Sequence, residues 1–213
     1  MSRQLDHIVF ICDDLERGSE RFAELTGVTP TFGGVHASGR TQNSLLRLGG
    51  DAYLEILAPV GPPSAGDDDW TRQAHAAGEG RVLTYCLRSA TPLADLAEVA
   101  NRHGWGTVPV QSNGRTRPDG GQLRWHWLEL PASPFGRAFP FFIDWLDSTH
   151  PSRSLGSPDA PPALLLKRFA VGHAKAAPLA AALARFGHVI ATFASVTTTF
   201  QIELETPRGH VWL

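Results

Sequence analysis

The sequence has few of the features that would place it in a specialised class of protein. It holds only two cysteines in 213 residues, Cys12 and Cys86, too few for a disulfide-stapled scaffold. Each lies at or near an apolar strand, so we interpret both as reduced core residues. No run of 18 apolar residues occurs, and the first residues show no apolar signal region. These absences predict a cytoplasmic protein that makes no contact with a membrane.

The sequence also lacks an excess of basic residues and any phosphate-binding motif. Its formal net charge of −2 argues against a nucleic-acid binder, which would present a basic face. Neither a G-x-G-x-x-G fingerprint nor a P-loop occurs, so a nucleotide is not expected. With 42% apolar and 19% charged residues, the composition is that of an ordinary globular chain that can bury a core. The expected partner is therefore a small molecule.

What the chain does have is a repeated pattern of a strand, a helix and further strands. Gly27, Gly104 and Gly187 end the three predicted helices at intervals of 77 and 83 residues. In the first copy, Asp13 is predicted to cap the helix, with Glu16 as its capping-box partner. A period of this size indicates an internal repeat, and hence an α+β fold in which a curled sheet carries its helices outside.

Polar residues interrupt three apolar strands of these repeats. His7 lies within "LDHIVFI", where it is either a hydrogen-bonded core histidine or a residue that faces a cavity. In "AYLEIL" the alternation places Glu55 on one face with Tyr53 and Leu57. Asp144 lies in the corresponding strand of the second copy, "FPFFIDWL". A carboxylate in an apolar strand is costly to bury unless it is paired or binds something, so the three residues together favour a site.

The order of these motifs resembles the glyoxalase-like branch of the vicinal-oxygen-chelate superfamily over residues 5–151. The resemblance is carried by "LDHIVFICDDLERGSERFAELTGVTP", "GGVHASGRTQNSLLRLGGDAYLEILAP" and "PFFIDWLDSTHP". It implies βαβββ units, two of which form a half-open barrel around one cavity. In metal-using members, a first-strand histidine and a last-strand glutamate from each unit hold a divalent ion.

Carried over to this chain, the resemblance implies three metal ligands: His7, Glu55 and Asp144. The fourth position departs from the family pattern, because the second unit offers Leu83 or Thr84 where a histidine or glutamine would stand. Histidine and carboxylate ligands suit Fe(II), Mn(II), Zn(II) or Ni(II). Glu55 and Asp144 are the predicted catalytic carboxylates, with Asp144 either ligating the ion or shuttling a proton.

Four further residues are predicted to contact the substrate: His36, Asn43, His126 and Trp145. His126 is equally consistent with a packed core histidine, and His36 with an exposed loop. The segment "QSNGRTRPDGGQ" is interpreted as a polar hairpin tip or lid, whose two arginines could meet an anion but are expected to be solvated.

Two functions follow from this reading. The first is a metal-dependent enzyme of the lyase, isomerase or dioxygenase type, in which the ion stabilises an enolate-like intermediate. The second is a metal-free protein that binds or sequesters a small molecule.

Residues 1–151 are predicted to form the paired units, and residues 163–213 a third unit that packs on or extends the same domain. A third possibility is a scaffold in which that unit drives formation of a homodimer.

Overall fold

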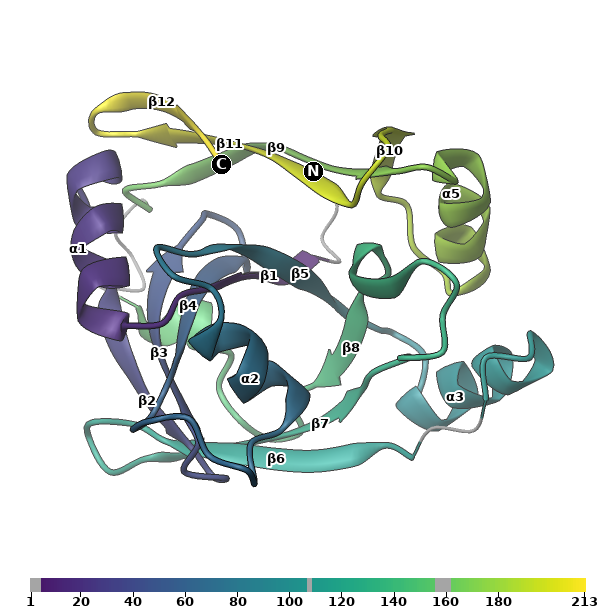
Figure 1. The fold of residues 1–213 in the computed structure, drawn as a ribbon, viewed down its shortest axis with the longest axis horizontal. Helices are drawn as coiled ribbons and strands as arrows, with labels where there is room; N and C mark the ends of the chain where they lie inside the picture. The colour runs from purple at the N-terminus through teal and green to yellow at the C-terminus, as the bar shows by residue number, and fades with distance from the viewer. Residues whose placement is uncertain (1–4, 107–108, 156–161) are drawn as a thin grey trace.

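A computed structural model describes residues 5–106, 109–155 and 162–213; residues 1–4 of the predicted first part lie outside it. Eight strands form a closed barrel, and the C-terminal segment forms a separate four-stranded sheet (Figure 1). The predicted α+β class is confirmed. Among the described residues, no helix is long and apolar enough to cross a membrane.

Each half of the barrel is one βαβββ unit. The first unit comprises β1 (Leu5–Ile11), α1 (Leu15–Thr26), β2 (Thr31–His36), β3 (Thr41–Arg47) and β4 (Tyr53–Pro59). The second comprises β5 (Arg81–Arg88), α3 (Leu93–Arg102), β6 (Gln111–Thr116), β7 (Gln122–Leu128) and β8 (Phe141–Asp144). The short helices between and after these strands are α2 (Asp69–His75), η1 (Gly136–Ala138) and α4 (Pro151–Ser154).

The two units share one strand order, which is why they close on each other. In each, the first strand pairs in parallel with the last, giving the orders β1-β4-β3-β2 and β5-β8-β7-β6. Antiparallel pairing of β1 with β5 and of β2 with β6 joins the units into a barrel. The barrel is thus closed, although its β2–β6 seam is short and pairs only Val35 with Thr116 and His36 with Arg115 among the described residues.

The third segment repeats the order of elements but not the strand pairing. It comprises β9 (Leu165–His173), α5 (Ala176–Arg185), β10 (Ala191–Ala194), β11 (Thr199–Thr206) and β12 (Gly209–Trp212). Its sheet order is β10-β9-β11-β12, so its first strand lies beside the second and third instead of the last. In Figure 1 this sheet lies along the top of the view, above β1 and β5. Tyr85 of the barrel contacts Phe169 of β9, with ring centroids 4.9 Å apart, within one shared core.

Helix α1 illustrates how local sequence sets the elements. Its N-cap is Asp14, whose side chain accepts from Arg17 N at 2.9 Å, and not the predicted Asp13. Asp13 lies one residue earlier and instead forms an ion pair with the Arg17 side chain. Gly27 ends the helix as predicted, at a φ of 75° that favours glycine. Phe22 of this helix packs edge-on against Phe10 on the outer face of the barrel.

Alternation along the strands divides the barrel into an outer and an inner face. Ile8 and Phe10 of β1 face outward into the core beneath the helices, whereas Val9 and Ile11 face inward. Together with Leu83 of β5, these inner residues belong to an apolar cluster inside the barrel. The polar residues of the inner face lie around the remaining space.

Candidate active site

A cavity of about 690 Å³ lies inside the barrel and receives side chains from both units. Its volume is within the range usual for small-molecule sites. One part of its wall is polar, with His7, His36, Asn43, Glu55 and Arg115. Another part is aromatic, with Trp70, Trp125, Trp127, Phe141 and Trp145, and it adjoins the polar part where His36 packs edge-on against Trp125 and His7 against Phe141.

His7 is held in one orientation by its neighbour in the sequence, Asp6. The pairing of β1 with β5 shifts register between Leu5 and His7, and this irregularity brings the adjacent side chains together. His7 Nδ1 donates to Asp6 Oδ1 at 2.7 Å, which leaves Nε2 directed toward Glu55. The imidazole also stacks on Tyr53, with ring centroids 4.7 Å apart. His7 is therefore a cavity residue whose ring orientation is set by Asp6 and Tyr53.

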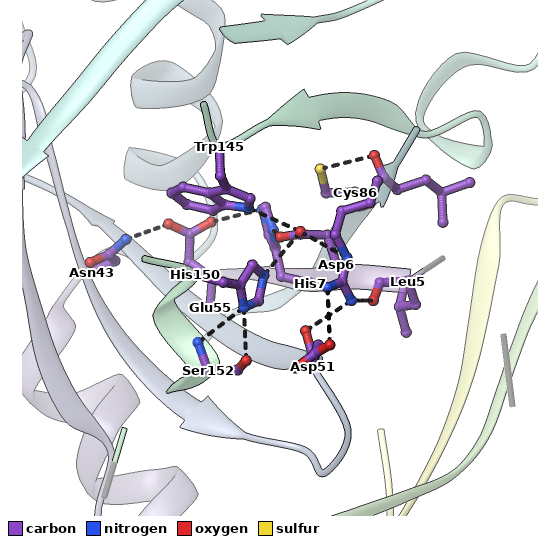
Figure 2. Close-up of polar contacts among 12 residues, drawn as sticks. Leu5, Asp6, His7, Asn43, Asp51, Glu55, Cys86, Trp145, His150 and Ser152 are labelled. Carbon is purple, nitrogen blue, oxygen red and sulfur yellow. Dashed lines mark hydrogen bonds and ion pairs between the residues drawn. The ribbon is translucent and has the colours of Figure 1, made fainter. Parts of the chain in front are cut away.

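Asp6 is the hub of a buried polar network (Figure 2). Its second oxygen, Oδ2, accepts from Trp145 Nε1 and His150 Nε2, each at 3.0 Å, and lies 3.4 Å from Arg88 Nε. Burial alone would raise the pKa of this carboxyl, but the hydrogen bonds from His150 and His7 outweigh burial and hold the pKa well below its usual range. Asp6 is therefore ionised and positions His7 without facing the cavity itself.

Glu55 is the buried carboxylate among the residues that line the cavity. It lies in the middle of β4, and only 8% of it is exposed. Its Oε1 accepts from Asn43 Nδ2 at 2.5 Å, and its Oε2 lies 3.7 Å from His7 Nε2. His36 Nε2 approaches Oε1 to 3.7 Å from the other side. Burial lowers the pKa of His36 below its ordinary value, although the Glu55 carboxylate opposes that change.

Arg115 completes the polar wall and is the site residue that the sequence analysis placed in a solvated loop. Residues 111–116 form strand β6 instead, and Arg115 is only 4% exposed. Its Nη1 donates to Asn43 Oδ1 at 2.5 Å, so Asn43 links the guanidinium to Glu55. The sequence did not indicate Asp6 and His150 as site residues, because they are 144 residues apart in the chain and only the fold brings them together.

The structure brings most of the predicted site residues together, but not all of them. His7, Glu55, His36, Asn43 and Trp145 line one cavity. His126 and Asp144 do not, and they are Cα partners on β7 and β8. The inward positions of those strands are taken by Trp125, Trp127, Phe141 and Ile143, so alternation directs His126 and Asp144 outward.

Asp144 therefore does not meet His7 and Glu55. It is exposed, and its Oδ1 accepts from the backbone N–H of Leu146 in the turn after β8. At the two positions where the family pattern would place ligands of the second unit, the inward side chains are thus apolar. Leu83 belongs to the apolar cluster of the interior, and Ile143 lines the cavity.

Among the described residues, one group of potential ligand atoms lies within 4.8 Å of one another: those of Asp6, His7 and Cys86. Two of these three residues are poorly suited to bind a metal ion. Asp6 accepts four polar contacts, and burial raises the pKa of the Cys86 thiol well above its ordinary value, so the thiolate that metals bind is disfavoured. The imidazole and carboxylate side chains that line the cavity are those of His7, His36, Glu55 and Asp68. Asp68 caps helix α2, so His7 Nε2 and the Glu55 carboxylate, with His36 on the second oxygen of Glu55, are the groups that approach one another.

Comparison with known proteins agrees with this architecture. A family described as "Glyoxalase-like domain" matches residues 5–187, which span both barrel units and α5. The chain belongs to this glyoxalase-like family, and thereby to the vicinal-oxygen-chelate superfamily. No curated protein matches the chain at a significant level.

Solved structures resemble this glyoxalase-like protein at low sequence identity. A hypothetical protein from Staphylococcus aureus has a TM-score of 0.66 at 16% identity, covering 98% of this chain and 83% of its own. Methylmalonyl-CoA epimerase from Streptomyces coelicolor, in complex with 2-nitronate-propionyl-CoA, has a TM-score of 0.45 at 19% identity and covers 66% of this chain and 95% of its own. The epimerase from Mycobacterium tuberculosis has a TM-score of 0.43 at 13% identity, covering 66% and 85%. At these identities, the first likeness supports the fold alone.

Proposed function

We propose that this protein is an enzyme that moves a proton on a small molecule with adjacent oxygen groups, bound inside the barrel. The observation that carries the proposal is the pairing of Glu55 with the oriented His7 at the cavity wall. A buried carboxylate between two imidazoles is an arrangement suited to acid–base chemistry. Membership in the glyoxalase-like family supports an activity of this type.

A divalent cation fits the donor set of the first unit, though not the four-ligand site implied by the sequence resemblance. His7 Nε2 and Glu55 Oε2 would hold it, since they face each other at 3.7 Å and Asp6 backs the imidazole as carboxylates commonly back metal-binding histidines. His36 is the third candidate ligand. When bound, such an ion supplies Lewis-acid stabilisation of a developing oxyanion.

The protein's own groups divide the remaining work. With Oε2 directed toward His7, Oε1 of Glu55 is the atom that accepts and returns the proton. Asn43 holds that oxygen in place, and Arg115 polarises the Asn43 amide from its other end. The aromatic side chains of the cavity lower the polarity beside these groups, which strengthens each of the interactions.

Solvent-proton exchange tests this proposal. Pyruvate, phenylpyruvate and hydroxyacetone are incubated with the metal-supplemented protein in D₂O, and loss of the proton signal beside the carbonyl is followed by NMR. We expect the protein to make the exchange of at least one compound faster than it is without protein. In Glu55→Gln, the rate of this exchange should fall about 10²–10⁴-fold. Asp144→Asn removes a carboxylate outside the cavity and should keep the wild-type rate. Equal rates in the wild type and Glu55→Gln would refute the proposed role of Glu55.

The second candidate function is a metal-free binding protein. The apolar residues at the second unit's inward positions and the aromatic wall favour it. Tight binding of a compound without any exchange, at each metal supplied, is the result that would support it. The homodimer and the cytoplasmic location stay predictions.

A further inference from the structure

Arg115 is a buried cation with an unusual lack of charged partners. It is only 4% exposed, and it lines the cavity from strand β6. Within the described part of the chain, its guanidinium bonds to Asn43 and has no carboxylate oxygen within 4.0 Å. A buried charge without a partner is costly, so a cation kept at a cavity wall indicates a ligand that supplies the missing charge.

Other partly buried arginines of the chain do have carboxylate partners. Arg88 pairs with Asp6 and Asp51, and Arg137 pairs with Asp69 and Glu129. Glu55 is the acidic residue nearest to Arg115 in the cavity, but Asn43 stands between them and bonds to both. Arg115 thus retains donor capacity that the protein itself does not use.

The neighbouring strand leaves space for this guanidinium. Gly33 of β2 lies against Arg115 Nη1 and Asn43 Oδ1, and a Cβ at this position would overlap both atoms. Gly34 follows at a φ of 131°, with a Cβ position that would meet the backbone oxygen of Thr116. The two glycines let β2 approach β6 closely and keep Arg115 at the cavity wall.

The aromatic part of the cavity wall indicates the rest of the ligand. Trp70 and Trp127 pack edge-on against Phe141, with ring centroids 5.5 and 5.9 Å away. Trp125 and Trp145 form a second pair at 5.2 Å. These rings lie at steep angles to one another and offer both edges and faces, with which an aromatic ligand body can pack edge-to-face or offset-stacked.

We infer that the cavity binds carboxylates with an aromatic body, the carboxylate on Arg115 and the ring against the tryptophan wall. This inference rests on the proposed function in one respect: it takes the bound carboxylate to be the substrate of the proposed enzyme. Arg115 provides planar, paired N–H donors, and a carboxylate accepts such donors in a bidentate manner. Neutral analogues of the same shape lack that interaction.

Binding of phenylacetate compared with phenylacetamide tests the inference without any turnover. Each is titrated into the full-length protein and followed by calorimetry and tryptophan fluorescence. We expect the acid to bind about tenfold or more tightly than the amide, because a charge-assisted pair is replaced by a neutral contact. In Arg115→Gln this preference should fall to about one, and Arg115→Lys should keep part of it.

Arg117→Gln is the matched control. Arg117 carries the same charge two residues along and pairs with Asp119, outside the cavity lining. Loss of the Arg117 charge should change the ratio of acid to amide affinity by no more than about threefold, because solvent screens a charge outside the cavity. Circular dichroism measures whether each variant folds. If Arg115→Gln does not fold, the inference is tested by the ratio of acid to amide affinity in the wild type and in Arg115→Lys.

Three results would overturn the inference. They are equal affinity of the wild type for acid and amide, no binding of either at about 10 mM, and an undiminished preference in folded Arg115→Gln. Phenylacetate has no carbonyl beside its carboxylate, so this experiment reads recognition alone. Its failure would leave the Glu55 proposal standing, and failure of the exchange experiment would leave the Arg115 inference standing.

Discussion

Replacing Asp6 by asparagine should destabilise the protein more than any other single change in the network around His7. The carboxylate receives hydrogen bonds from His7, His150 and Trp145, and it lies beside the Arg88 guanidinium. Removing one partner of a buried charge pair typically costs about 3–5 kcal/mol. Asparagine retains one acceptor oxygen, and Arg88 keeps its contact with Asp51, so we expect the lower end, about 3 kcal/mol.

Urea unfolding at neutral pH, followed by tryptophan fluorescence, measures this loss. For an m value of about 1–3 kcal/mol per molar urea, a loss of about 3 kcal/mol lowers the midpoint by about 1–3 M. Asp51→Asn is the control, because Asp51 also contacts Arg88 but is half exposed, and its loss should cost under about 1 kcal/mol. A midpoint for Asp6→Asn within error of the wild type would refute the account of Asp6 as the hub.

The same pair of proteins tests the electrostatic origin of the effect. Since the folded-state pKa of Asp6 lies below its ordinary value of 3.8, the stability that its ionisation contributes is fully present above that value. It is lost as pH falls from there toward the folded-state pKa. The difference between wild type and Asp6→Asn should therefore be constant near neutral pH and shrink below about pH 4. A difference that stays constant to the lowest pH at which both fold would contradict this origin.

Three further predictions concern other parts of the chain. Burial lowers the pKa of His188 from an ordinary 6.5 to about 4. The free energy of unfolding should therefore be fully maintained above pH 6.5 and decline by at most about 3 kcal/mol as pH falls toward 4, a decline that pH-dependent unfolding of His188→Phe should lack. Gly33→Ala should displace Arg115 and Asn43 and lower the free energy of unfolding by about 1–3 kcal/mol, and an unchanged urea midpoint would contradict the close approach. His126→Ala should leave ligand affinity unchanged in calorimetry, because His126 faces away from the cavity.

Strand alternation made much of the first unit predictable. Glu55, Tyr53 and Leu57 were expected on one face of a strand, and all three line the cavity. The resemblance implied that His7 and Glu55 share one site, and the structure has His7 Nε2 3.7 Å from Glu55 Oε2. The repeat predicted the barrel units, since each strand–helix–strands segment requires a partner to bury its sheet.

Two strands of the second unit were harder to predict, because β8 is short and β6 is polar. In β8, four residues long, the cavity face is set by Phe141 and Ile143, one residue out of phase with Asp144. In β6, the polar segment lacks apolar alternation, so its strand character depends on pairing with β2 and β7. The role of Arg115 therefore appears only when Asn43, 72 residues earlier, lies beside it.

Asp6 was missed for a different physical reason. Neighbouring residues of a regular strand face opposite ways, so a residue next to His7 is expected on the other face. The register shift between Leu5 and His7 breaks that rule and lets Asp6 reach the His7 ring. A bulge of this kind depends on strand pairing, which one sequence does not reveal.

Metal content is the measurement that tests the central claim most directly, namely that His7 and Glu55 form the functional centre. Wild-type protein and three variants, His7→Ala, Glu55→Gln and Asp144→Asn, are dialysed against Fe(II), Mn(II), Zn(II) or Ni(II) and assayed by elemental analysis. We predict about one ion per chain in the wild type and in Asp144→Asn, and loss of that ion in the other two. No bound ion in the wild type, or equal content in all four proteins, would contradict the claim.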